Sequence, residues 1–507
     1  MTRLEPVPAS HDCTAAPGES QGPPTKRMRL GSEKWQDEST ATPADQTVVR
    51  RHPLGIRPSG NALTSSANSK RSCGHFARLS DELLLQLLEA LQPAQLLRLG
   101  ATCRALHAFT RSEELWRALF VESPPSAFQW RGTWRSTYLG QASTNEPNVD
   151  CSDVFSDALH RPFFCAHVPL LSYSQNIPTA NEICRMENMS VSDFSHEWFD
   201  KPFILTAPVR SWPIYQTWSI DHLVAQHPEV KFRAEAVDWP LKTYAEYMAD
   251  NRDELPLYLF DRAFAEKMDL SPAAYHPPPC FHPDAFTTLG TQRPDHRWLI
   301  VGPARSGSTF HKDPNATSAW NAVLTGAKYW IMFPSARAGR TRPPPPGVFV
   351  SADQREVTTP LSIAEWLLGF HAAARATPGC REGVCAAGEL LHVPGGWYHL
   401  VLNLAPSVAL THNFVPRPRV AAVLRFLRDQ RASVSGFPAE VRDPYDLFVA
   451  RLRAHDPALL REALDAMDRS TCKATWNGLV ADGAIAPGEG EHAGFSFGFG
   501  GDGDEVP

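Results

Sequence analysis

The chain has 507 residues, enough for two or three domains, and its hydrophobic content of 43% is ordinary for a globular protein. Its net charge of −6 argues against a protein that coats nucleic acid, because phosphate binding requires an excess of Lys and Arg. Direct nucleic-acid binding is therefore not indicated. Ten thinly spread cysteines indicate reduced thiols and an intracellular protein. We expect no signal peptide and no membrane span, because no stretch has the required apolar character.

Residues 1–74 are rich in Pro, Ser and Thr and poor in aromatic side chains, which predicts a disordered tail. The tail contains the basic cluster "PPTKRMRL", with Lys26, Arg27 and Arg29. Clusters of this kind are often only solvated, but they also form nuclear import signals. We expect a nuclear protein, with the cytoplasm as the alternative location.

Residues 75–122 predict a bundle of about three helices. Ser80 can cap the first helix, and Pro93 suits the first turn of the second. The first helix has one apolar face at helical spacing, formed by Leu83, Leu84, Leu87, Leu88 and Leu91. Periodicity alone is equally compatible with a generic helical subdomain packed on its neighbour.

The residues of this bundle resemble an F-box over about 45 positions. The matching positions are Leu79, Glu82, Leu84, Leu96–Leu99, Cys103–Arg104 and Leu115–Trp116. Ser80 stands where the family usually has proline. F-boxes bind the Skp-family adaptor of cullin-type ubiquitin ligases, so the resemblance implies that the exposed leucine face is a partner interface.

Short β-rich runs punctuated by Pro and Gly occupy residues 150–415, among them "KPFILTAP", "KYWIMFP" and "HLVLNLAP". This pattern predicts a barrel or a double-sheet jelly roll within a chain of mixed class. Helical periodicity over residues 416–480 predicts a C-terminal helical cap. Residues 481–507 are rich in Gly and acids and predict a flexible tail.

Three candidate metal ligands lie at the ends of predicted strands. His311 and Asp313 are two residues apart, so on a strand they point to the same side. His399 follows a Pro-Gly-Gly turn and opens another apolar strand. Two histidines and a carboxylate form the facial triad of non-haem Fe(II) oxygenases, although a zinc site with the same ligands remains open. The chain has 19 histidines, and any single one is more often a surface residue than a ligand.

A 2-oxoglutarate site would also need a cation or hydroxyl groups for the distal carboxylate. Lys328 lies in the otherwise apolar run "GAKYWIMF", where it is either a solvated edge residue or a buried cation. Thr411, Asn321 and Ser308 supply hydroxyl and amide groups near the relevant strands.

The runs "GPARSGSTFHKDPNATSAWNAVLTGAKYW" and "VPGGWYHLVLNLAPSVALTHNF" closely resemble the JmjC oxygenases of the phosphatidylserine-receptor type, which are lysyl hydroxylases and demethylases. The resemblance implies that this domain is a double-stranded β-helix, a cupin-like jelly roll. It also implies that His311, Asp313 and His399 are the catalytic Fe(II) ligands. The positions that bind 2-oxoglutarate in the family are Lys328, Asn321, Thr411 and Ser308, with Ser308 in place of the family's threonine. An F-box ahead of a JmjC domain is similar to the F-box/JmjC proteins of fungi and plants.

The resemblance implies a dioxygenase that couples oxidative decarboxylation of 2-oxoglutarate to oxidation of a C–H bond in a protein substrate, such as a histone or an RNA-processing protein. Oxidation at a side-chain carbon gives a stable alcohol, whereas oxidation at an N-methyl group leads to demethylation. The three iron ligands are the same for both reactions. Two other functions stay open, namely an F-box substrate receptor that uses the JmjC fold for recognition, and a zinc cupin without redox chemistry.

Overall fold

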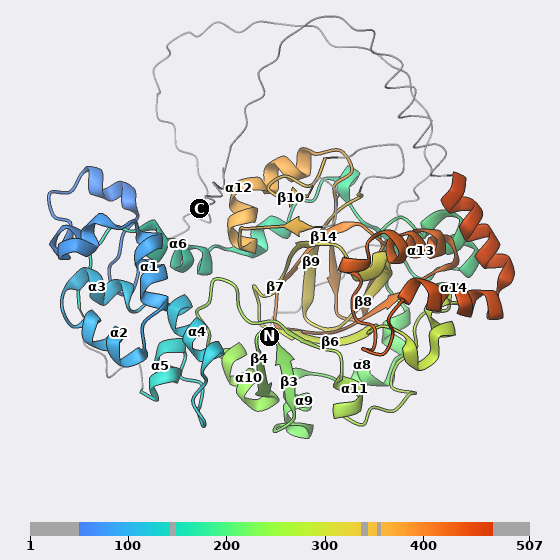
Figure 1. Cartoon of the computed structure of the whole chain (residues 1–507), viewed down its shortest axis with the longest axis horizontal. Helices are drawn as coiled ribbons and strands as arrows, with labels where there is room; N and C mark the ends of the chain where they lie inside the picture. Colours follow the sequence, from blue (N-terminus) through green and yellow to red (C-terminus); the bar gives the residue numbers. More distant parts are fainter. Residues whose placement is uncertain (1–49, 142–148, 336–342, 352–355, 470–507) are drawn as a thin grey trace, which may run out of the picture. The chain divides into compact units, whose positions relative to one another are not determined.

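The computed structural model describes residues 50–141, 149–335, 343–351 and 356–469 (Figure 1). The predicted tail over 481–507 and the basic cluster at Lys26–Arg29 lie outside them. The domain limits 75–122, 150–415 and 416–480 stay predictions. None of the helices in the described ranges has both the length and the apolar character needed to cross a membrane.

The prediction of disorder is wrong for residues 50–74. This segment forms the 3₁₀ turns η1 (Ser59–Leu63) and η2 (Ser69–Ser72), and η3 (Gly74–Arg78) follows directly. Its backbone pairs with a segment about 85 to 100 residues later in the chain, for example from Ser69 N to Asp153 O at 2.9 Å. Order here comes from long-range hydrogen bonds, which a composition argument does not detect.

Five short helices follow, and a sixth begins the connection to the sheets. They are α1 (Asp81–Glu89), α2 (Pro93–Gly100), α3 (Arg104–Phe109), α4 (Glu113–Glu122), α5 (Trp134–Leu139) and α6 (Asp157–Ala166). Ser80 caps α1 by accepting a hydrogen bond from Leu83 N, as predicted. Leu84 and Leu88 are fully buried, whereas Leu83 and Leu87 are 54% and 42% exposed. The leucines of α1 therefore serve both the core and the surface.

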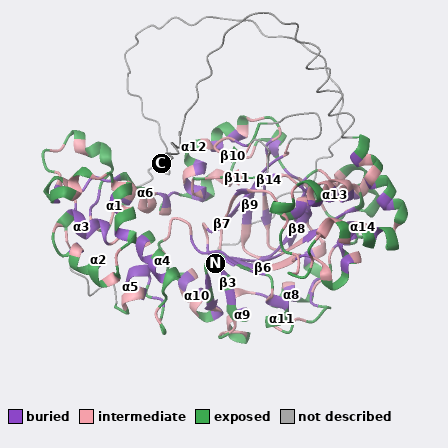
Figure 2. Ribbon diagram, in the orientation of Figure 1, coloured by how far each residue is buried: buried purple, intermediate pink, exposed green. Residues whose placement is uncertain are grey.

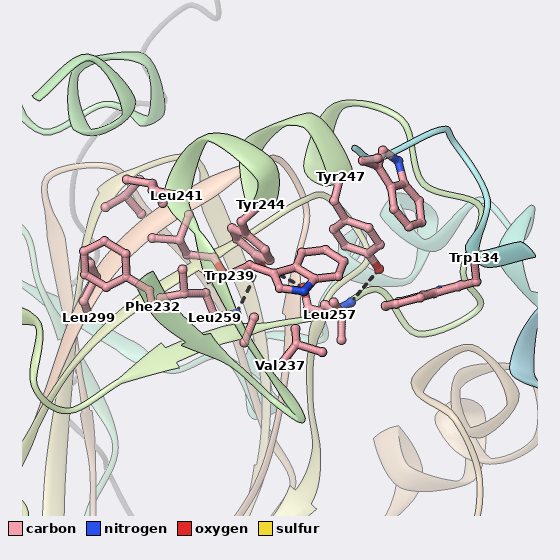
Figure 3. Close-up of a cluster of buried hydrophobic side chains, with 14 of the residues drawn as sticks. Trp134, Phe232, Val237, Trp239, Leu241, Tyr244, Tyr247, Leu257, Leu259 and Leu299 are labelled. Carbon is pink, nitrogen blue, oxygen red and sulfur yellow. Dashed lines mark hydrogen bonds between the residues drawn. The ribbon is translucent and has the colours of Figure 1, made fainter. Parts of the chain in front are cut away.

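The helical bundle and the first part of the sheet share one hydrophobic core. Trp134 of α5 packs against Trp239, with ring centroids 5.7 Å apart, and against Tyr247 at 6.0 Å (Figure 3). Phe120 of α4 also contacts Trp239, at 5.7 Å. Aromatic pairs of this kind contribute about 0.5–1.5 kcal/mol each beyond the area they bury. Hydrophobic packing, and not only the connecting segment of the chain, thus holds the helical bundle against the sheet.

Two sheets form the predicted jelly roll. The larger has the order β1-β2-β13-β8-β15-β6-β5-β3-β4, and the smaller has the order β12-β9-β14-β7. The strands of the larger sheet are β1 (Cys184–Met186), β2 (Phe203–Leu205), β3 (Lys231–Ala234), β4 (Val237–Pro240), β5 (Leu259–Asp261), β6 (Arg297–Gly302), β8 (Ser318–Thr325), β13 (Glu389–Val393) and β15 (Ser407–Phe414). Those of the smaller sheet are β7 (Gly307–His311), β9 (Ala327–Phe333), β12 (Arg381–Ala386) and β14 (Tyr398–Asn403).

Strand β9 of the smaller sheet has an almost continuous apolar sequence because both of its faces are covered. Trp330 and Met332 face the core shared with the larger sheet, whereas Tyr329 and Ile331 face a second core that includes Trp366 of α12 (Ile363–Ala376). A strand covered on both faces has no polar side, so alternation disappears. Figure 2 shows β9 and β14 as mostly buried and the outer faces of the surrounding helices as exposed.

The remaining helices cover the sheets. They are α7 (Val191–Asp193), α8 (Pro213–Thr217), α9 (Ile220–Gln226), α10 (Leu241–Ala249), α11 (Phe264–Lys267), α13 (Val420–Asp429) and α14 (Pro444–His455), with a further helical run over 457–469. The helices after β15 build their own core with Phe286 and Leu289. A two-stranded ribbon, β10 (Phe349–Val350) with β11 (Val357–Thr358), lies between β9 and α12 in the chain.

The two kinds of leucine in α1 predict different stability effects. Leu84→Ala removes a fully buried side chain and should lower the free energy of unfolding by about 2–5 kcal/mol. The neighbouring exposed variant, Leu83→Ala, should change it by less than about 0.5 kcal/mol. Urea unfolding followed by far-UV circular dichroism measures both, and equal effects would contradict the burial of this helix face.

Candidate metal and 2-oxoglutarate site

The structure brings His311, Asp313 and His399 together. His311 ends β7, Asp313 lies in the turn after it, and His399 is the second residue of β14. The two strands pair antiparallel with His399 opposite His311, and each of the three side chains offers a ligand atom within 4.8 Å of the others. A register shift follows His399, and bulges of this kind commonly re-aim side chains next to active sites.

Both histidines have the tautomer that a metal requires. Nδ1 of His311 lies 2.8 Å from Thr309 O and Nδ1 of His399 lies 3.1 Å from Trp397 O. A carbonyl only accepts, so each Nδ1 carries the proton and each Nε2 lone pair is available for coordination. Burial lowers the pKa of both imidazoles, which keeps them neutral.

Asp313 fits the same role. Burial raises the pKa of its carboxyl group, although the neighbouring His311 and a hydrogen bond with Asn413 oppose this rise. Its Oδ2 is buried and has no hydrogen-bond partner among the described residues. A buried carboxylate oxygen without a donor is unfavourable unless a cation binds it. The donor set of two imidazoles and one carboxylate therefore suits a divalent transition metal.

Three of the four predicted 2-oxoglutarate residues, Ser308, Asn321 and Thr411, line one cavity of about 250 Å³ with the three metal ligands. Asn321 of β8 lies opposite Thr411 of β15 in the larger sheet, and Ser308 lies on β7 in the smaller one. Asn321 Oδ1 is buried without a hydrogen-bond partner in the described part of the chain, whereas the Thr411 hydroxyl donates to Trp320 O at 2.9 Å. The cavity thus lies between the two sheets.

Lys328 is a buried cation and not an edge residue. It is 0% exposed and lies on β9, which is paired on both sides by β12 and β14. Its Nζ donates to the Tyr258 hydroxyl at 2.6 Å and to Asn403 Oδ1 at 2.9 Å. Both partners are neutral, and burial lowers the pKa of Lys328 to about 7. A buried ammonium with only neutral partners is suited to an anionic ligand.

Sequence reasoning missed Tyr258 and Asn403. Tyr258 lines the cavity, and its hydroxyl accepts the hydrogen bond that connects Lys328 to the cavity wall. It lies in a loop before β5, where no periodicity marks it as inward-facing. Asn403 is the cross-strand partner of Lys328. An asparagine in the apolar run "HLVLNL", like the lysine in "GAKYWIMF", was a signal for a buried polar pair.

Comparison with known proteins gives the same answer as this geometry. Residues 298–414 match the family described as "JmjC domain, hydroxylase", and residues 76–122 match an F-box-like domain. The arginine-specific demethylase JMJ22 of Arabidopsis thaliana is 37% identical over 423 residues, which are 80% of this chain and 82% of that protein.

Two other relatives match a smaller share of the chain. The bifunctional arginine demethylase and lysyl-hydroxylase psr-1 of Caenorhabditis elegans is 31% identical over 271 residues, 48% of this chain and 64% of psr-1. The human 2-oxoglutarate and iron-dependent oxygenase JMJD4 is 30% identical over 152 residues, 29% of this chain and 34% of that protein. The chain therefore belongs to the JmjC family of iron- and 2-oxoglutarate-dependent oxygenases and carries an F-box-like domain ahead of the oxygenase domain.

Proposed function

We propose that this oxygenase removes methyl groups from methylarginine side chains of nuclear proteins, histones among them, with hydroxylation of lysine as the alternative outcome. The observation that carries the enzymatic part is the convergence of three ligand atoms within 4.8 Å in a cavity next to a buried lysine. The choice of arginine is supported by JMJ22, a relative over four-fifths of the chain whose name states that specificity.

His311, Asp313 and His399 would hold Fe(II), which with 2-oxoglutarate and oxygen supplies the oxidant for a C–H bond. The carbonyl groups of Thr309 and Trp397 keep both imidazole rings in the ligating tautomer. The ring of Trp330 stacks on His399 with 6.0 Å between centroids and restricts its rotation. These contacts preorganise the ligands before a metal binds.

Lys328 would bind the distal carboxylate of 2-oxoglutarate together with the Tyr258 hydroxyl. Asn321, Thr411 and Ser308 would supply the remaining polar contacts from the cavity wall. Burial raises the pKa of Tyr258, so its hydroxyl stays protonated at neutral pH and can donate to a carboxylate. A dianionic ligand compensates a buried ammonium that otherwise has only neutral partners.

Aromatic walls of the cavity suit a methylated cationic side chain. Phe260 and Trp298 both line it, with ring centroids 5.4 Å apart. Aromatic faces attract alkylated ammonium and guanidinium groups, and the attraction grows when water is excluded. Demethylation then requires only that an N-methyl carbon, and not a chain carbon, lies at the oxidised position.

The F-box-like domain suggests a second interaction. Leu83, Leu87 and Leu97 are between 42% and 54% exposed on α1 and α2, more than a monomeric bundle requires. We propose that this leucine face binds a Skp-family adaptor of a cullin-type ubiquitin ligase. An adaptor would place the oxygenase next to the ligase without a role in the oxidation itself.

Metal binding tests the ligand assignment. His311→Ala should weaken Fe(II) binding by more than about 100-fold, a larger loss than partners of ligands usually cause. His222→Ala, which removes an exposed histidine on α9, is the matched control and should bind like the wild type. Anaerobic titration with a competing chelator measures both, and unchanged affinity of the His311 variant would exclude this site.

The pH dependence of 2-oxoglutarate binding tests Lys328. Because burial lowers the pKa of the free lysine to about 7, and a bound carboxylate favours the ammonium form, binding takes up a proton above this pH. Affinity should fall about tenfold per pH unit above about pH 7. Tyr258 and Cys385, whose pKa values burial raises, stay protonated there. Calorimetry on Mn(II)-loaded protein measures this slope, and Lys328→Arg should flatten it. A slope retained in that variant would rule out Lys328.

Product analysis tests the substrate class. Histone-tail peptides with dimethylarginine, with arginine, or with lysine alone are incubated with enzyme, Fe(II), ascorbate and 2-oxoglutarate. We expect loss of one methylene mass and release of formaldehyde from the first peptide, absent with His399→Ala. A gain of one oxygen on lysine peptides would instead establish hydroxylation, and succinate without any peptide product would contradict both substrates.

A further inference from the structure

We propose that Arg117, on F-box helix α4, is a positioning residue for the 2-oxoglutarate pocket, acting through Glu235 and residues 253–258 to place Tyr258. The proposal rests on the proposed role of Lys328 and Tyr258 in binding 2-oxoglutarate. It assigns to the F-box-like domain a part in 2-oxoglutarate binding, in addition to the proposed binding of an adaptor.

Arg117 reaches from the helical bundle to the loop before β5. Its Nη1 donates to Leu255 O at 3.0 Å, and its Nη2 donates to Glu235 Oε2 at 2.7 Å. Its Nη1 also lies 3.8 Å from Asp253 Oδ2. The guanidinium group stacks 5.6 Å from the ring of Trp134, and its side chain is only 26% exposed. One planar group thus joins the bundle to a carbonyl and two carboxylates.

Glu235 carries the connection directly to the backbone of Tyr258. Its Oε1 accepts from Tyr258 N at 3.2 Å, while Oε2 receives Arg117. Glu235 lies in the two-residue turn between β3 and β4 with a φ of 50°, a left-handed conformation that is unfavourable for a residue with a Cβ atom. Strain of this kind persists only where surrounding contacts hold it, and both carboxylate oxygens are so held.

A second contact from the bundle holds the same loop. The Trp134 indole donates to Asp253, with 3.0 Å to each carboxylate oxygen. The Tyr247 hydroxyl donates to Asp253 Oδ2 at 2.6 Å and accepts from Leu257 N at 2.7 Å (Figure 3). Trp134 comes from the helical bundle, whereas Tyr247 comes from α10, so the loop is fixed between the two.

Residues 251–258 have no helix or strand of their own, so side-chain contacts determine where Tyr258 lies. At the far end of this loop the Tyr258 hydroxyl receives Lys328 Nζ at 2.6 Å and lines the cavity. Three side-chain contacts therefore separate the F-box helix from the buried ammonium: Arg117 to Glu235, Glu235 to Tyr258, and Tyr258 to Lys328.

Loss of Arg117 would disturb the loop electrostatically as well as sterically. Burial raises the pKa values of Asp253 and Glu235, and Arg117 is the positive group that opposes this rise in both. Without it, partly buried carboxylates stand unpaired, and an unpaired buried charge is relieved by protonation or by movement. Movement of the Glu235 carboxylate releases Tyr258 N, and movement of the Asp253 carboxylate releases the Tyr247 hydroxyl that accepts from Leu257 N.

The test compares Arg117→Met with the control Arg233→Met. Arg233 lies on β3 and pairs with Asp238 at 2.9 Å, but its side chain is 51% exposed and, within the described residues, has no hydrogen bond or ion pair with the loop. Arg117→Met should raise the dissociation constant of 2-oxoglutarate by about 3–30-fold, and Arg117→Lys should recover part of the loss. Fe(II) affinity should stay within about twofold, because the ligands are distant from the change. The control should match the wild type in both.

Glu235→Gln is an independent test, because this substitution lies outside the helical bundle. Its amide oxygen can still accept from Tyr258 N, but the ion pair with Arg117 is lost. We expect a smaller loss of 2-oxoglutarate affinity that is not additive with Arg117→Met, as for residues in one network. A folded Arg117→Met protein with wild-type 2-oxoglutarate affinity would overturn the proposal, as would parallel losses of Fe(II) and 2-oxoglutarate affinity. Failure of the wild type to bind 2-oxoglutarate would instead overturn the proposed function.

Discussion

The register of β14 against its two neighbours is the constraint on which the site depends. β14 pairs with β7 so that His399 faces His311, and with β9 so that Asn403 faces Lys328. Because successive side chains of a strand point to opposite faces, residues 399, 401 and 403 lie on the same face of β14. A slip by one residue would turn the histidine and the asparagine away from the cavity together. The pairing of His399 with His311 and the pairing of Asn403 with Lys328 therefore both depend on the register of β14.

Strand alternation made part of this site predictable. His311 and Asp313 at a spacing of two, and His399 at the start of an apolar strand, were sufficient to propose a three-ligand centre. Lys328 was ambiguous, because an isolated run does not reveal whether its strand is central or at an edge. Tyr258 was missed because contacts from other elements hold its loop, such as the hydrogen bond from Tyr258 N to Glu235 in the β3–β4 turn. The order of residues 50–74 was missed for the same reason, since their backbone pairs with residues 151–156.

The common core of the helical bundle and the sheet changes how the F-box-like domain should be understood. Sequence periodicity left open whether this bundle packs on its neighbour, and the structure shows that Phe120 and Trp134 pack on Trp239 and Tyr247 of the oxygenase part. Leucines that face outward on α1 stay available for a partner. The bundle thus exposes leucines of α1 and α2, whereas its helices α4 and α5 contact the oxygenase part.

The anaerobic visible spectrum tests the central claim most directly, because a keto acid chelated to Fe(II) at this site gives a metal-to-ligand charge-transfer band. We predict that the wild-type protein shows the band only when both Fe(II) and 2-oxoglutarate are present. The band should require more 2-oxoglutarate to develop in Lys328→Ala. A folded protein that binds Fe(II) but shows no band at saturating 2-oxoglutarate would contradict the account of the cavity as an oxygenase centre.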